Sequence, residues 1–283
     1  MVLSIIMCSR TQTIKKELSE NIQKTIGCEY ELIVIDNSHN DKSIFEAYRQ
    51  GEQQSTGEYL CFVHDDVEFI SENWGIIVSD YFKQHPKCGC LGIAGGHVLP
   101  QCVSGWSICG ICSTNILQGY CENGCQEYKI NKQDSLKRDP TIVAALDVVF
   151  LCFPKKIFHT IEWDTKNYAG YHFYDMDICM QINSSNFECH INWDILLKHR
   201  SPGFADKNFK KMGEIWYKKW SKYLPLVKGV ELDFQIIEAL NNYAKLQQYY
   251  SELQHSKQYR IGKIILAPFT LLHKIINRIT KCN

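Results

Sequence analysis

The sequence predicts an α/β protein with a mostly parallel central sheet. Short apolar runs alternate with amphipathic stretches of helical period along the first ninety residues, and each apolar run ends in polar residues. Hydrophobic residues make up 45% of the chain and charged residues 22%, which is ordinary for a folded globular protein. Strand–helix alternation with short connections is typical of βαβ units, in which parallel strands end at one common edge.

The first part of the chain contains four predicted strands separated by helices. We expect strands at 2–8, 31–35, 57–65 and 90–94, and helices at 13–26, 43–54 and 73–85. In the first helix Ile14, Leu18, Ile22 and Ile26 share one face, and Pro86 stops the third helix. This order predicts a sheet covered by helices, with polar turns at its carboxyl edge.

The second part is less regular. Residues 100–140, rich in Gly, Cys, Ser and Asn, are expected to form an insertion over or beside a site. We expect, in order, a strand at 141–153 interrupted by Asp147, a short helix at 154–159, an aromatic loop at 168–177, a helix at 178–183, a strand at 187–191, a strand end and turn at 196–203, and helices at 206–223 and 231–254. The predicted organisation is therefore a domain at 1–209, C-terminal helices at 210–256 and a tail at 257–283.

Charge and composition exclude some classes of function. The formal net charge is +0, so nothing supports general nucleic-acid binding. No apolar run is long enough for a membrane span, and residues 1–7 lack the basic region and cleavage site of a signal peptide. The 14 cysteines are therefore expected to be reduced thiols of a cytoplasmic protein. The spacing of Cys109 and Cys112, with Cys121 and Cys125, leaves structural zinc open as a weaker alternative.

The final segment, 257–281, contains no acidic residue. Its isoleucine and leucine side chains fall on one helical face, and Lys263, Lys274, Arg278 and Lys281 fall on roughly the opposite face. A basic amphipathic helix suits an anionic membrane surface, so we expect peripheral attachment at the inner face of the cytoplasmic membrane. A helix packed on the domain with a solvated basic side is the alternative.

Two adjacent carboxylates follow the third apolar run. Asp65 and Asp66 would lie at the carboxyl edge of the sheet, where ligands of open α/β sheets bind. Two like charges there favour a divalent cation with oxygen ligands, although acidic residues at a helix N-terminus would follow the same pattern. The pair alone leaves both possibilities open.

Four segments in order carry a resemblance to a known family. They are 33–37 (IVIDN), 62–66 (FVHDD), 170–177 (GYHFYDMD) and His199 followed by 201–203 (SPG). With these segments, residues 2–209 resemble the inverting glycosyltransferases of family 2, which have the GT-A fold. The likeness is to the bacterial branch that includes streptomycin-biosynthesis-type domains.

The resemblance implies a nucleotide-sugar site. The donor is expected to be a UDP-sugar, bound by Ser9, Arg10, Asp36, Asn37 and Asp65. The resemblance also implies a divalent metal, Mn²⁺ or Mg²⁺, held by Asp66 and His199, and imidazole suits manganese better than magnesium. His64 stands where the family has the first aspartate of its D-x-D motif, which is a departure from the pattern.

The same resemblance implies a catalytic base. Asp175 aligns with the carboxylate that takes the proton of the acceptor hydroxyl, and Tyr174 replaces the acid that normally precedes it. Asp177 is expected to cap or support the following helix. Tyr171, His172 and Trp106 are expected to contact the acceptor sugar. For Trp106, packing in the core is an equally supported interpretation.

The expected function is therefore inverting, metal-dependent glycosyl transfer in bacterial surface polysaccharide or glycolipid synthesis, with a saccharide or lipid-linked saccharide as acceptor. A degenerate relative that binds a nucleotide sugar or a partner without catalysis is the alternative, because His64 and Tyr174 replace acids. A nucleotidyltransferase on a related fold is disfavoured, since residues 8–13 contain no glycine for a phosphate loop.

Overall fold

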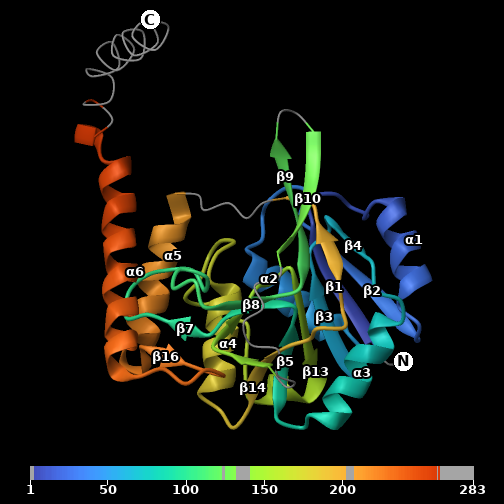
Figure 1. The fold of residues 1–283 in the computed structure, drawn as a ribbon. Coiled ribbons are helices and arrows are strands. Elements are labelled where there is room, and N and C mark those ends of the chain that lie inside the picture. Colours follow the sequence, from blue (N-terminus) through green and yellow to red (C-terminus); the bar gives the residue numbers. More distant parts are fainter. Residues whose placement is uncertain (1–2, 123–124, 132–140, 202–206, 260, 262–283) are drawn as a thin grey trace, which may run out of the picture.

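A computed structural model describes residues 3–122, 125–131, 141–201, 207–259 and 261, and contains a seven-stranded mixed sheet with helices on both faces (Figure 1). The order across the sheet is β11, β14, β5, β13, β3, β1, β2. These strands are β1 (Leu3–Ser9), β2 (Tyr30–Asp36), β3 (Tyr59–Val63), β5 (Cys88–Gly92), β11 (Thr141–Val143), β13 (Phe150–Pro154) and β14 (Glu188–Ile191). Strands β13 and β11 run against the other five, so the expected mostly parallel sheet is confirmed.

The side chains of the central strands alternate between two apolar cores. Ile6 and Phe62 face a core that includes residues of α2 (Ile44–Gln54) and α4 (Tyr174–Asn183). Ile5 and Cys61 face the other core, which includes residues of α1 (Lys16–Thr25) and α3 (Trp74–Gln84). Because both faces of the sheet are buried, these strands are continuous apolar runs in the sequence.

The remaining strands of the described chain form three smaller sheets. The longest contains β10 (Cys125–Asn131), β9 (Ile116–Glu122), β15 (Leu197–His199) and β4 (Val67–Phe69). Another contains β12 (Ala145–Leu146), β6 (Ala94–Gly96) and β8 (Cys112–Thr114), and a third pairs β16 (Leu226–Val227) with β7 (Val98–Leu99). The prediction of one strand at 141–153 is wrong, because this run is divided among β11, β12 and β13. Asp147 lies at the break, where its backbone N–H donates to the carbonyl of Ala94 at 2.7 Å.

Two short 3₁₀ helices and two longer helices complete the described chain. They are η1 (Lys155–His159), α5 (Lys207–Trp220), η2 (Ser221–Tyr223) and α6 (Phe234–His255). Figure 1 shows α5 and α6 side by side at one edge of the molecule. Of the predicted tail, 260 and 262–283 lie outside the described residues, and the domain division at 209 stays a prediction. Within the described ranges, no helix has the length and apolar character needed to cross a membrane.

The cysteines differ from the expectation of free thiols at one pair. Cys61 and Cys152 are register partners on β3 and β13 and are joined by a disulfide. Burial raises the pKa of the Cys109 thiol to about 12 and that of Cys112 to about 11, so neither thiol ionises readily. In the part of the chain that the structure describes, no group of three potential metal ligands includes a cysteine. The zinc alternative therefore has no support among these residues.

Candidate functional site

A polar turn joins β3 to β4 at the carboxyl edge of the sheet. It consists of His64, Asp65 and Asp66, because β3 ends at Val63, two residues before the predicted end. The Ser9 hydroxyl, at the end of neighbouring β1, donates to Asp65 Oδ2 at 2.7 Å. Polar residues at or just beyond the ends of β1 and β3 are therefore in contact at this edge of the sheet, through Ser9 and Asp65.

Two histidines and one carboxylate converge beside this turn. Strand β15 pairs antiparallel with β4 and places His199 opposite Val67, which brings it next to Asp66. The His199 Nε2 atom lies 3.3 Å from Asp66 Oδ1 and 3.3 Å from His64 Nδ1. One ligand atom from each of these three residues lies within 4.8 Å of the others. Two imidazoles and a carboxylate at this spacing fit a divalent transition metal such as Mn²⁺.

The protonation states of this cluster also suit a cation. Burial alone would raise the pKa of Asp66, but hydrogen bonds from His199 and Ser201 outweigh it and hold that pKa well below its usual range. The Ser201 hydroxyl donates to Asp66 Oδ2 at 2.6 Å and its backbone N–H donates at 3.1 Å. Burial, and then the neighbouring His199, lower the pKa of His64, so this imidazole is neutral at neutral pH. Ionised carboxylate and neutral imidazole are the forms that bind metals.

A residue outside the predicted set supports His199. The Gln118 Oε1 atom on β9 lies 3.2 Å from His199 Nδ1, the ring nitrogen that faces away from Asp66. Because Gln118 Oε1 can accept the Nδ1 proton, this contact would keep Nδ1 protonated when Nε2 gives up the proton that it shares with Asp66, and Nε2 could then bind a metal. The sequence offered no signal for this contact, because it depends on the parallel pairing of β15 with β9.

Asp175 lies in the first turn of α4, which begins at Tyr174, four residues before the predicted start. Phe173 precedes the helix in a left-handed conformation with φ of 64°. The Met176 N–H donates to Asp175 Oδ1 at 2.7 Å. Burial, and then the negative charge of Asp147, raise the pKa of Asp175 to about 7. A carboxylate with this pKa is half protonated at neutral pH and suits proton transfer.

Asp147 is a residue of the candidate site that the sequence analysis did not include in it. Its Oδ2 atom accepts a hydrogen bond from Trp106 Nε1 at 3.1 Å, and its Oδ1 accepts one from the Val149 N–H at 2.9 Å. Its charge raises the pKa values of both His64 and Asp175, so it lies within electrostatic reach of both. A lone carboxylate inside an apolar run was the signal that could have identified it.

The two departures from the family motifs contact each other. The hydroxyl of Tyr174, which is buried, lies 3.3 Å from His64 Nε2. Asp175 is therefore the chain neighbour of a residue that touches the metal-ligand cluster. Asp147 acts electrostatically on both Asp175 and His64, so the predicted base lies in the neighbourhood of the cluster.

The residues predicted to bind the nucleotide lie at or just beyond the carboxyl ends of β1, β2 and β3. The Asn37 side chain donates to the carbonyl of Lys42 at 2.9 Å and to the Tyr171 hydroxyl at 2.6 Å. Asp36 Oδ1 accepts the Ser38 N–H at 2.9 Å, and this bond holds the pKa of Asp36 below its usual value. Asn37 thus organises the loop after β2, while Arg10, just beyond β1, is exposed.

The structure attaches the three predicted acceptor residues to different segments. The Tyr171 hydroxyl contacts the loop after β2, on the side of Asn37. The His172 ring packs edge-on against Phe209 of α5, with ring centroids 5.5 Å apart. Trp106 contacts Asp147. Of the three, Trp106 is therefore the one that contacts Asp147, the residue whose charge raises the pKa of Asp175.

Asp177 has a structural position, in agreement with its predicted supporting role. It is 1% exposed and accepts hydrogen bonds from Trp220 Nε1 at 2.7 Å and from the Tyr168 hydroxyl at 3.0 Å. Lys219 Nζ lies 2.9 Å from its Oδ1. These contacts fasten α5 to α4.

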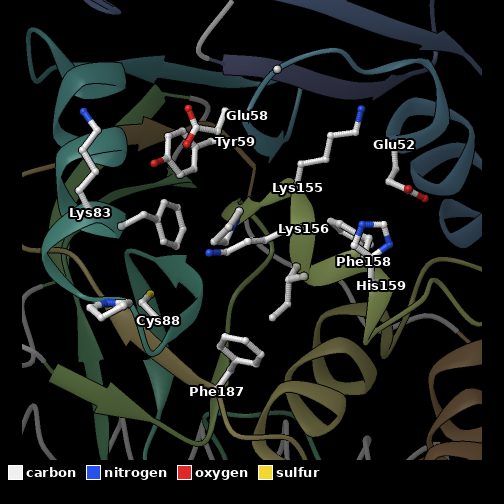
Figure 2. A pocket seen from close by; sticks show the side chains of 15 residues that line it. Glu52, Glu58, Tyr59, Lys83, Cys88, Lys155, Lys156, Phe158, His159 and Phe187 are labelled. Carbon is white, nitrogen blue, oxygen red and sulfur yellow. The ribbon is translucent and has the colours of Figure 1, made fainter.

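A cavity of about 620 Å³ lies at the opposite end of the sheet. Figure 2 shows residues that line it, including Tyr59 and Cys88 at the amino ends of β3 and β5. It contains none of the predicted site residues. The polar cluster at the carboxyl edge is therefore the better candidate for chemistry, because ligands of α/β sheets bind at that edge.

Comparisons with known proteins agree with this architecture. A model of a glycosyltransferase-like family matches residues 4–224. The structure is similar to GalNAc-T7 with UDP, GalNAc and Mn²⁺, at 12% identity and a TM-score of 0.50, over 90% of this chain and 58% of that one. It is also similar to residues 1–349 of TarS from S. aureus in complex with UDP-GlcNAc, at 12% identity and a TM-score of 0.52, over 92% of this chain and 78% of that one. No curated protein sequence matches the chain. The chain thus has the GT-A fold and spans little more than half the length of GalNAc-T7.

Proposed function

Because the chain belongs to the glycosyltransferase-like family, we propose that it transfers a sugar from a UDP-sugar to an acceptor hydroxyl with inversion at the anomeric carbon. One observation supports this proposal above the others. The Asp175 carboxylate, whose pKa is raised to about 7, is adjacent in the chain to Tyr174, whose hydroxyl contacts the His64–Asp66–His199 cluster. A proton acceptor and a candidate cation site are the two groups that a single displacement on a diphospho-sugar requires.

The uridine diphosphate would bind across the ends of β1, β2 and β3. Both structural neighbours named above were solved with UDP or a UDP-sugar, which supports uridine as the nucleoside of the donor. Asp36 is the candidate acceptor for the hydroxyls of the ribose or for the base. Ser9 orients Asp65 through its hydrogen bond, and exposed Arg10 supplies a positive charge beside the same strand ends.

A divalent metal would be held by His64, Asp66 and His199, with Gln118 orienting the last of these. The two imidazoles favour manganese over magnesium. When bound, the ion would neutralise charge on the departing diphosphate. In this assignment His64, which replaces the first aspartate of the D-x-D motif, is itself a metal ligand.

Asp175 would accept the proton of the acceptor hydroxyl as the oxygen attacks the anomeric carbon. Its Oδ1 atom already accepts the Met176 N–H, which leaves Oδ2 for the acceptor. The negative charge of Asp147 makes Asp175 a stronger base than an ordinary aspartate. Because one base and one displacement suffice, no covalent intermediate is required.

The setting that we propose is synthesis of a surface polysaccharide or glycolipid by a family 2 enzyme of the bacterial branch. The sequence of residues 257–281, without acidic residues, favours contact with an anionic membrane surface. The acceptor would then be a saccharide or a lipid-linked saccharide at the inner face of that membrane.

A comparison of binding and turnover tests the proposal. Wild-type protein with Mn²⁺ is screened for release of UDP from a panel of UDP-sugars, with and without saccharide acceptors. We expect Asp175→Asn to keep UDP affinity within about twofold and to lower turnover at least about 100-fold, the size typical of losing a general base. Asp80→Asn, on the exposed surface of α3, is the matched control and should keep full turnover. Wild-type protein that binds UDP without any turnover would favour the alternative, a degenerate binding protein.

A further inference from the structure

Helix α6 carries an apolar stripe that the described part of the chain leaves exposed. Its members recur at alternating steps of three and four residues: Ile236, Ala239, Tyr243, Leu246, Tyr250 and Leu253. All six are exposed, and the exposed fraction reaches 62% at Leu246 and 51% at Tyr250. We call this set the α6 stripe. Exposure of so many apolar side chains along one line of a helix marks an interaction surface.

The α6 stripe is distinct from the face that packs on the domain. Ala244 is fully buried and Leu240 is partly buried, against Val98, Cys102 and Cys109. At 100° per residue, Leu240 and Ala244 lie at the edge of the α6 stripe or beyond it, on the side toward the domain. The helix therefore has one apolar face that packs on its own domain and another that is exposed.

The spacing identifies the kind of partner. Steps of three and four give an average period of 3.5 residues, which is the repeat of positions a and d in a two-stranded coiled coil. The α6 stripe contains three consecutive a/d pairs over roughly 26 Å of helix. Position 257, the next in the series, is a lysine, so the apolar seam ends with the helix.

The charges of α6 favour a protein surface over a lipid one. The helix contains one lysine and two glutamates, Lys245, Glu238 and Glu252, all at positions outside the stripe. A helix that binds anionic lipid carries an excess of Lys and Arg, which α6 lacks. The residues that flank the stripe, at e and g, are Gln235, Leu240, Asn242, Gln247, Tyr249 and Gln254, and none of them is charged. Two copies of α6 therefore meet without like-charge repulsion.

From this pattern we infer that the α6 stripe is a dimer interface, in which α6 of one chain packs along α6 of a second copy. The helix is already held by its own domain, so pairing does not have to order it, which lowers the cost of association. Tyrosine suits two of the a positions, since its ring is buried while its hydroxyl reaches water at the margin. The contact is isologous, with the same surface on both copies.

Sedimentation equilibrium of the full chain at several concentrations tests the inference. We expect a concentration-dependent dimer for the wild type and a dimer dissociation constant at least tenfold higher for Leu246→Glu. Lys245→Glu is the matched control, because it places the same side chain at the adjacent exposed position outside the stripe and should leave the dimer intact. Circular dichroism of each variant confirms that the fold is unchanged.

Three results would overturn the inference. The first is a wild-type protein that stays monomeric at all protein concentrations up to roughly 100 μM. The second is a dimer whose dissociation constant is unchanged in Leu246→Glu and in Tyr250→Glu. The third uses vesicles of anionic phospholipid: a monomer that binds them and loses binding in Leu246→Glu would assign the α6 stripe to a membrane instead.

Discussion

Removal of the Asp147 charge should lower the pKa of Asp175. The pKa of Asp175 is about 7 against an ordinary 3.8, and burial contributes more to this difference than Asp147 does. We therefore expect Asp147→Asn to recover less than half of the difference, roughly one pKa unit, which corresponds to about 1.4 kcal/mol. The direction follows because a neighbouring negative charge disfavours the ionised carboxylate.

The consequence for the rate is specific to acidic pH. With a pKa near 7, about a tenth of Asp175 is ionised at pH 6, and with a pKa near 6 about half is ionised. If Asp175 is the base, the ratio of kcat/KM at pH 6 to kcat/KM on the plateau above pH 8 should be about fivefold higher in Asp147→Asn than in the wild type. The plateau itself should fall, because a less basic carboxylate accepts a proton less readily.

The pKa can be measured directly by NMR titration of ¹³C-labelled aspartate side chains, with Asp175→Asn used to assign the resonance. Trp106→Phe is the control, since it removes the hydrogen bond to Asp147 and leaves the charge. An Asp175 pKa that stays near 7 in Asp147→Asn, or one that falls as far in Trp106→Phe, would refute the reasoning.

Three further predictions follow from the same contacts. Asp175→Asn should stabilise the fold at pH 8 by up to about 4 kcal/mol in urea unfolding and by much less near pH 4, because a carboxylate whose pKa is raised in the folded state from 3.8 to about 7 loses stability as the pH rises between these two values; equal effects at both pH values would contradict this. Asp177→Asn should lower the free energy of unfolding by roughly 1.5 kcal/mol, since the hydrogen bonds from Trp220 and Lys219 lose their charged acceptor while Lys219 keeps Asp164 as a partner, and an unchanged free energy of unfolding would show that the contact is dispensable. Asn37→Ala should weaken UDP binding about tenfold in calorimetry, because the loop tied to Tyr171 loses its hydrogen bonds, and unchanged affinity would place the nucleotide elsewhere.

The central strands were predictable because a sheet buried on both faces leaves uninterrupted apolar runs. The run at 141–153 was wrongly predicted as one strand because apolar residues indicate burial but not the sheet to which a residue belongs. Strands β11, β12 and β13 are all apolar, although β12 belongs to a different sheet from the other two. The start of α4 was placed too late because Phe173, Tyr174 and Met176 are aromatic or apolar without a clear helical period.

Some residues of the candidate site could be proposed from the sequence, but their arrangement could not. Asp66 and His199 were both anticipated, whereas the role of His64 depends on the pairing of β15 with β4, which no local pattern reveals. Asp147 was visible only as an irregularity, since its effect on Asp175 arises from tertiary contact. The Cys61–Cys152 disulfide likewise depends on the antiparallel register of β13 with β3.

The most direct test of the account is calorimetric titration of the full chain with UDP, with and without Mn²⁺. We predict binding that strengthens at least tenfold with Mn²⁺ in the wild type and loses that gain in Asp66→Asn, while Asp80→Asn behaves as the wild type. UDP affinity that is the same with and without Mn²⁺, or a manganese effect that survives in Asp66→Asn, would contradict a metal site at His64, Asp66 and His199.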